Sequence, residues 1–191
     1  MIRLILASNS PRRRELLQNA GFEFEVRPSG IEETRLPGES PEDFTRRLAL
    51  DKALDVARQA STGSLVLGAD TVVAINGEIL EKPADAEDAA RMLRTLSGRT
   101  HRVITGVCLV RAPENVLARK HETTSVTFRN LTEDEIGSYV SSGEPFDKAG
   151  GYAIQGLASR FVTRIEGCYF NMVGLPISLV YEMVKSIKVK E

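Results

Sequence analysis

The sequence has little of what several classes of enzyme require. Its 191 residues include two histidines, His101 and His121, and two cysteines, Cys108 and Cys168, that stand far apart. Two histidines exclude a zinc site with several imidazole ligands and argue against a Ser-His-Asp triad. The cysteines lack metal-binding spacing, so we expect two free buried thiols in a reducing cytoplasm.

An excess of charge of either sign is also missing. The chain has 25 Lys and Arg against 26 Asp and Glu, a net charge of −1. A protein that coats a nucleic-acid polymer would be strongly basic, so we expect no such partner. No apolar run reaches the length of a membrane span, and the first residues lack the apolar region and cleavage site of a signal peptide. We therefore expect a cytoplasmic protein with no membrane partner.

Two common nucleotide-binding motifs are absent. The sequence has no G-x-x-x-x-G-K followed by Ser or Thr, which excludes a Walker-type NTPase, and no G-x-G-x-x-G for dinucleotides. Its content of 42% hydrophobic and 27% charged residues is ordinary for a globular protein. The length fits a single domain over residues 1–191, with one or two lobes.

Periodicity and turn residues predict an α/β protein. We expect strands at 2–7, 22–27, 65–75, 78–80, 103–110, 123–128 and 161–165, and helices at 11–20, 41–60, 86–96, 133–142 and 176–188. Residues 144–156 are expected to form a glycine-rich loop with a short strand. Strands and helices alternate at first, and hairpins follow. This predicts a mixed, twisted β-sheet with flanking helices and two lobes around a central cleft, one wall of which comes largely from residues 144–175.

The turn from the first strand to the first helix is the most informative segment. Ser10 can cap the helix, and Pro11 takes its favoured first position. Arg12 and Arg13 follow at once, although cations are unfavourable at a helix N-terminus. Together with Ser8 and free backbone N–H groups, they form a site suited to an anion such as phosphate. The alternative is a solvated basic turn.

A lysine interrupts the apolar stripe of the longest helix. Lys52 lies four residues from both Leu48 and Val56. Such a lysine commonly extends to the edge of the apolar surface, with its ammonium in water. The alternative is an ammonium that points into a cleft to meet an anion.

A carboxylate interrupts the apolar strand expected at 65–75. Burying Asp70 there costs several kcal/mol unless it is paired or bound to a metal. It could be hydrogen-bonded to a neighbouring loop, but small neighbours, Gly68 and Ala69, leave room for a ligand. We favour a functional role.

Cations and carboxylates recur along the chain in a combination that suits a triphosphate with a metal ion. The cations are Arg12, Arg13, Lys52, Lys82 and Lys148, and the carboxylates are Glu33, Asp70 and Asp147. Cations neutralise the phosphates, and carboxylates hold the metal or activate water. With so few histidines, oxygen ligands point to Mg²⁺ or Mn²⁺.

Several segments together resemble the Maf family of nucleoside triphosphate pyrophosphatases, which are linked to bacterial septum formation. They are residues 8–13 (SNSPRR), 68–73 (GADTVV), 81–83 (EKP), 97–101 (SGRTH), 147–150 (DKAG), 154–156 (IQG) and 174–176 (GLP). The resemblance covers essentially the whole chain, in order. It implies a fold like that of inosine triphosphate pyrophosphatases, and a homodimer.

The resemblance also implies a reaction and a set of residues. A nucleoside triphosphate is cut between its α and β phosphates, with a divalent cation. The positions that match the family are Ser8, Arg12 and Arg13 for the phosphates, Lys52 and Lys82 as further cations, and Glu33 and Asp70 as the acidic residues. Asp70 matches the proton acceptor, and the sequence leaves open whether it deprotonates water itself or binds the metal that does so.

Base selection is expected to depend on Gln155. The loop around it, with Lys148, resembles that of the subgroup acting on dTTP and UTP, where Arg12 and Thr71 are also tied to specificity. An amide can donate to O4 of uracil or thymine and accept from N3–H, whereas a carboxylate can only accept. Alone, Gln155 could equally be a strand-end residue bonded to backbone.

Two other functions remain open at this stage. One is a purine-directed pyrophosphatase of the inosine triphosphate type, against which Gln155 and the loop at 147–148 argue. The other is a regulator of cell division that binds a nucleotide without hydrolysing it. The intact carboxylates Asp70 and Glu33, with Lys82, argue for catalysis.

Overall fold

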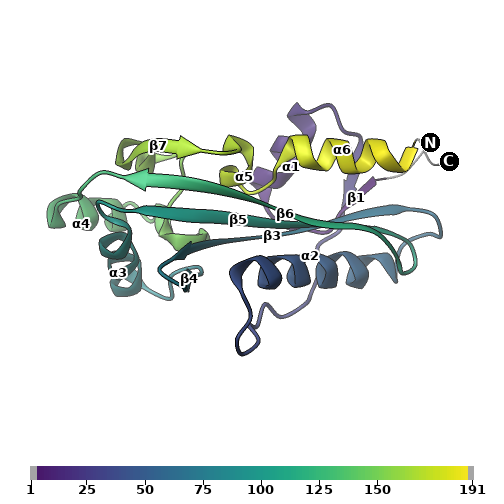
Figure 1. The fold of residues 1–191 in the computed structure, drawn as a ribbon, viewed down its shortest axis with the longest axis horizontal. Coiled ribbons are helices and arrows are strands. Elements are labelled where there is room, and N and C mark those ends of the chain that lie inside the picture. The colour runs from purple at the N-terminus through teal and green to yellow at the C-terminus, as the bar shows by residue number, and fades with distance from the viewer. Residues whose placement is uncertain (1–3, 189–191) are drawn as a thin grey trace. The chain divides into compact units, whose positions relative to one another are not determined.

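The computed structural model describes residues 4–188. Its strands are β1 (Leu4–Leu6), β2 (Phe24–Val26), β3 (Leu65–Ile75), β4 (Glu78–Leu80), β5 (Thr100–Arg111), β6 (Asn115–Phe128) and β7 (Val162–Glu166). Its helices are α1 (Pro11–Asn19), α2 (Pro41–Ala57), α3 (Ala86–Leu96), α4 (Glu133–Ser141), α5 (Tyr169–Val173) and α6 (Ile177–Lys188), with 3₁₀ turns η1 (Glu144–Asp147), η2 (Ala149–Gly151) and η3 (Leu157–Phe161). The predicted mixed α/β class is confirmed (Figure 1).

The strands form one mixed sheet in the order β2-β1-β3-β5-β6-β7, with β4 paired to β3. β1 is parallel to both β2 and β3, with Leu4 opposite Phe24 on one side and Leu65 on the other. β4 returns antiparallel along β3 after the Asn76-Gly77 turn, and β7 is antiparallel to β6. The parallel pairs come from helical crossovers, and the β3–β4 pair comes from a hairpin, as the alternation of elements predicts. The antiparallel β6–β7 pair is different, because α4 and three 3₁₀ turns lie between its two strands.

The chain divides into two compact units, each built from separate segments. The first contains the chain up to Asp70, residues 105–122 and residues from Gly174 onward; the second contains residues 71–104 and 123–173. In the first, α2 packs on β1, β3 and β5 through a buried core that includes Ile5, Ala53 and Val66. In the second, α3 and α4 cover a core that includes Leu93, Phe128 and Phe161. The expected cleft between two lobes stays a prediction.

Helix α2 lies unusually close to the strands of the first unit. A Cβ at Gly68 would lie 2.0 Å from the carbonyl oxygen of Ala49, and one at Gly106 would lie 2.2 Å from that of Thr45. Only glycine allows a backbone approach of this kind. The contact fixes the height of α2 above β3, and with it the position of Lys52, one turn beyond Ala49.

Several predicted boundaries are wrong. The short strand expected within 144–156 is replaced by the 3₁₀ turns η1 and η2, because Gly150 and Gly151 have φ of 68° and 69°, which turn the chain. α1 and α2 end earlier than expected, at Asn19 and Ala57, and Ala20 is exposed. β5 and β6 are longer, and α5 was not predicted.

Both cysteines are free thiols, as predicted. Cys108 is fully buried on β5, and burial raises the pKa of its thiol to about 12. Cys168 is only half-buried, so its predicted burial is wrong. Among residues 4–188, no helix combines the length and the apolar character needed to cross a bilayer.

A neutral histidine lies in the core of the second unit. His101 is 1% exposed, and its ring meets Phe128 and Tyr152 edge-on, with centroids 5.0 and 5.4 Å away. Nε2 lies 2.6 Å from the Tyr152 hydroxyl oxygen, while Nδ1 is buried and has no hydrogen-bond partner among the described residues. Burial lowers the pKa of His101 to about 4.

This burial predicts a loss of stability in mild acid. Between pH 6.5 and 4 the unfolded chain takes up a proton at His101 while the folded chain stays neutral, so the free energy of unfolding falls as the pH falls. The contribution is about 3 kcal/mol and is fully present only above pH 6.5. Urea unfolding across this range measures it. His101→Phe should flatten the dependence, whereas His121→Phe, at an exposed site, should not. Equal pH slopes for wild type and His101→Phe would refute the assignment.

Candidate active site

The turn from β1 to α1 forms the predicted helix start. The Ser10 hydroxyl accepts from the Arg13 backbone N–H at 3.4 Å, and Pro11 is the first helical residue. The Ser8 hydroxyl, which is buried, accepts from the Ser10 backbone N–H at 3.2 Å and from Arg13 Nη1 at 3.3 Å. Both serines therefore hold the first turn of α1, with Arg12 half-buried beside them.

Arg13 is part of the interior of the first unit. It is 9% exposed, and it donates from Nε to the Gly174 carbonyl and from Nη1 to the Ala69 carbonyl, both at 2.8 Å. Burial lowers the pKa of its guanidinium, although the charges of Asp70 and Glu33 raise it. The solvated basic turn is therefore wrong for Arg13. Its guanidinium anchors the residue before Asp70 and brings positive charge near two carboxylates.

Lys52 joins the two predicted acidic residues. Its Nζ lies 2.6 Å from Glu33 Oε1 and 2.7 Å from Asp70 Oδ1. The side chains of Lys52 and Asp70 are 10% and 8% exposed, whereas that of Glu33 is 49% exposed. The commoner expectation, an ammonium extended into water, is wrong. The ammonium is inside, and it supplies the partner that a carboxylate buried on β3 requires.

The oxygen atoms of Glu33 and Asp70 are the kind of ligand that Mg²⁺ and Mn²⁺ prefer. Within residues 4–188, no group of three or more His, Cys, Asp or Glu side chains could hold a metal ion. Glu33 and Asp70, which both contact Lys52, can nevertheless supply two ligands to a metal ion. Phosphate oxygens and water would supply the remaining ligands. The chemistry of these two side chains therefore fits a divalent cation whose other ligands come from elsewhere.

Four further predicted site residues belong to the second unit. Thr71 is half-buried on β3, and Lys82 is exposed just after β4. Lys148 donates from Nζ to the Glu144 carbonyl at 2.6 Å and to the Asp147 carboxylate. Gln155 is exposed in a turn before η3, so the alternative of a strand-end residue is wrong.

A carboxylate that the sequence did not single out holds the turn containing Gln155. Glu144 Oε1 accepts from the hydroxyl of buried Tyr139 at 2.8 Å, and Oε2 accepts from the Leu157 backbone N–H at 2.9 Å. A Cβ at Gly156 would lie 2.4 Å from this carboxylate. Gly156 therefore permits the contact. The only signal in the sequence is the glycine after Gln155.

The structure thus brings together five predicted residues of the first unit. Ser8 bonds to Arg13, which anchors Ala69 beside Asp70, and Lys52 bridges Asp70 and Glu33. Thr71, Lys82, Lys148 and Gln155 lie in the second unit. There, the Gly150 backbone N–H donates to the Glu81 carbonyl at 2.9 Å, which ties the glycine turn to the segment that carries Lys82.

Comparison with known proteins agrees with the motifs. A family profile described as "Maf-like protein" matches residues 3–187. A protein of Koribacter versatilis named dTTP/UTP pyrophosphatase is 53% identical over 182 residues, which are 95% of this chain and 93% of that one. A protein of Escherichia coli O157:H7 with the same name is 51% identical over 186 residues, 97% of this chain and 93% of that one.

Two solved structures share the fold. A HAM1 protein from Coxiella burnetii aligns with a TM-score of 0.57 at 17% identity and covers 97% of this chain and 100% of its own. The Staphylococcus aureus Ham1 protein aligns with a TM-score of 0.56 at 15% identity and covers 96% of this chain and 98% of its own. At these identities the likeness concerns the fold alone, and it confirms the expected mixed α/β fold.

Proposed function

This chain belongs to the Maf family, and from that premise we propose that it hydrolyses dTTP and UTP to the nucleoside monophosphate and pyrophosphate. The observation that carries the proposal is the contact of Lys52 with both Glu33 and Asp70. A carboxylate buried on β3 and held by an ammonium is suited to accept a proton from water or to hold a divalent cation, as hydrolysis requires. The names and near-complete coverage of the relatives support the substrate class.

Asp70 is the proposed proton acceptor. Water attacks the α phosphorus, its proton passes to an oxygen of Asp70, and the bond from the α phosphorus to the pyrophosphate leaving group breaks. Lys52 Nζ lies 2.7 Å from Asp70 Oδ1, and this contact orients the Asp70 carboxylate toward the attacking water. A Mg²⁺ or Mn²⁺ ion held by Glu33 and Asp70 would supply neutralisation of phosphate charge.

The cations of the site are proposed to bind the phosphates. Arg12 and Arg13 lie in the first turn of α1, where the helix dipole adds positive potential. Ser8 adds a hydroxyl next to them. Lys82 and Lys148 are proposed as further phosphate ligands. Lys148 would then exchange its contacts with the Asp147 carboxylate and the Glu144 carbonyl for phosphate oxygens.

Gln155 is the proposed reader of the base. Its amide can meet both O4 and N3–H of thymine or uracil, and Glu144 holds its turn in place. Gln155→Glu should lower kcat/KM for dTTP and UTP by about 10–100-fold, because one hydrogen bond is lost and one acceptor faces another. Steady-state rates of pyrophosphate release measure the effect. Since Gln155 is exposed, the melting temperature should not change. Unaltered rates for both nucleotides would remove Gln155 from this role.

A panel of nucleotides tests the function itself. Pyrophosphate release from dTTP, UTP and ITP is compared with Mg²⁺ and with Mn²⁺. We expect dTTP and UTP to be hydrolysed most efficiently. A clear preference for ITP would favour the purine-directed alternative. Absence of metal-dependent hydrolysis with every nucleotide would favour a nucleotide-binding regulator of cell division.

We also propose that the protein is a homodimer and acts in the cytoplasm. The homodimer is proposed from the resemblance to the Maf family, and the cytoplasm from the free thiols of Cys108 and Cys168. The mass in solution, measured by light scattering, distinguishes a dimer from a 21.0 kDa monomer.

A further inference from the structure

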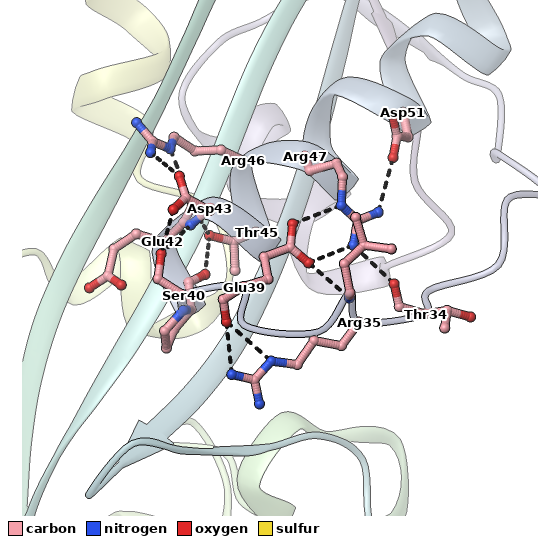
Figure 2. Close-up of polar contacts among 12 residues, drawn as sticks. Thr34, Arg35, Glu39, Ser40, Glu42, Asp43, Thr45, Arg46, Arg47 and Asp51 are labelled. Carbon is pink, nitrogen blue, oxygen red and sulfur yellow. Dashed lines mark hydrogen bonds and ion pairs between the residues drawn. The ribbon is translucent and has the colours of Figure 1, made fainter.

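One arginine of α2 fastens the loop that carries Glu33. Arg47 makes a bidentate ion pair with the Glu39 carboxylate. Its Nε donates to Oε1 and its Nη2 donates to Oε2, both at 2.8 Å. Its Nη2 also donates to the Thr34 carbonyl at 2.9 Å, and its Nη1 donates to Asp51 Oδ2 at 3.3 Å. Figure 2 shows this guanidinium between the loop on one side and Asp51 of the same helix on the other.

The contacts of Arg47 fall next to both partners of the Glu33–Lys52 ion pair. Thr34 follows Glu33 in the chain, and Asp51 precedes Lys52. One guanidinium therefore links the backbone beside Glu33 to the helical turn that bears Lys52. The 2.6 Å contact between Glu33 and Lys52 lies next to both ends of this link.

The loop that carries Glu33 has no regular secondary structure that could hold Glu33 in place. Residues 27–40 contain no helix or strand, and the Glu33 side chain is 49% exposed. Glu39, in contrast, is 9% exposed in its contact with Arg47. Its carboxylate also accepts from the Leu36 backbone N–H at 3.2 Å, and its carbonyl accepts from Arg35 Nη2 at 2.8 Å. Arg47 and Glu39 thus close the loop onto α2.

The neighbouring arginine provides a natural comparison. Arg46 contacts Asp43, three residues earlier on the same helix, and the Glu42 carbonyl. Figure 2 shows that this pair reaches no residue of the loop before Ser40 among those drawn. Adjacent arginines on one helix therefore differ in what they hold.

We propose that Arg47 is a positioning residue that holds Glu33 against Lys52 for metal and phosphate binding, an inference that rests on the proposed function. Residues that orient metal ligands typically change metal affinity or activity by about 10–100-fold when they are replaced. Arg47→Gln should therefore raise the Mg²⁺ concentration that gives half-maximal hydrolysis of dTTP by about 10-fold or more. Arg46→Gln is the matched control and should stay near wild type.

Two measurements separate positioning from a general loss of stability. Hydrogen exchange on the nucleotide-free protein should show faster exchange at the Leu36 amide in Arg47→Gln, with core strands unchanged. The double variant Glu33→Gln/Arg47→Gln should need no more Mg²⁺ than Glu33→Gln alone, because Arg47 acts through Glu33. Mn²⁺ binding, followed by electron paramagnetic resonance with a non-hydrolysable dTTP analogue, should be weaker in Arg47→Gln than in the wild-type protein. It should be no weaker in the double variant than in Glu33→Gln. If Arg47→Gln does not fold, the same measurements are made on Arg47→Lys. Lysine keeps the positive charge but cannot make the bidentate contact of a guanidinium.

The outcomes are distinct. Independent, multiplying effects of Glu33→Gln and Arg47→Gln, or an unchanged Mg²⁺ requirement in Arg47→Gln, overturn the positioning role and leave the proposed function standing. No hydrolysis by the wild-type protein overturns the proposed function, and the positioning role with it.

Discussion

Replacing Asp70 by asparagine is expected to lower kcat for dTTP by about 10²–10⁴-fold while nucleotide binding persists. Asparagine keeps the shape of the side chain and still offers an oxygen to Lys52 Nζ, which lies 2.7 Å from Asp70 Oδ1. It cannot take a proton from water, and it is a weaker ligand for a divalent cation. Pyrophosphate release gives kcat, and calorimetric titration with dTTP and Ca²⁺ in place of Mg²⁺ gives the affinity.

The control for this variant is Asp134→Asn, at an exposed position in the first turn of α4. It changes the same charge by the same chemistry and should keep the wild-type kcat. Turnover by Asp70→Asn within a few-fold of wild type would remove Asp70 as proton acceptor. The proposal would then need another base on the first unit.

Lys52→Met is expected to lower the free energy of unfolding by about 3 kcal/mol, besides abolishing hydrolysis. Methionine fills much of the space along the apolar stripe of α2, so the loss is electrostatic. Asp70 is left 8% exposed on β3 without its ammonium partner. The charge of Arg13 remains nearby and limits the loss to the lower end of what broken buried pairs cost. Urea unfolding at pH 7 measures the difference.

A second substitution distinguishes an unpaired charge from a packing defect. Lys52→Met/Asp70→Asn removes both charges, and it should recover most of the lost stability without recovering activity. If the single variant is as stable as wild type, then Lys52 does not stabilise a buried Asp70 carboxylate. If the double variant is no more stable than the single one, the loss comes from packing.

The sequence predicted correctly the bounds of those elements that begin and end at local signals, such as a turn or a helix cap. β3 matches the prediction at both ends, because the apolar run stops at Asn76-Gly77. α3 does so as well: Asp85 caps its start, and Gly98, at φ 68°, follows its end. A capping box formed by Thr132 and Glu135 marks the start of α4 in the same way. These signals act within a few residues, so no tertiary structure is needed to interpret them.

Side-chain direction could not be obtained in that way. Lys52 points inward because Gly68 and Gly106 let α2 approach the strands, a contact between residues far apart in sequence. Arg13 finds an acceptor at Gly174, 161 residues away. The prediction of a short strand within 144–156 was wrong because Gly150 and Gly151 take positive φ angles and turn the chain in η2. Residue types identified the charges of the site, and packing decided which of them meet.

The most direct test of the central claim is the identity of the products formed from dTTP with Mg²⁺. Chromatography of the reaction, with separate assays for pyrophosphate and orthophosphate, resolves them. We expect dTMP and pyrophosphate in equal amounts from the wild-type protein and almost none from Asp70→Asn. Formation of dTDP and orthophosphate, or the same products at the same rate from Asp70→Asn, would contradict a pyrophosphatase that acts through Asp70.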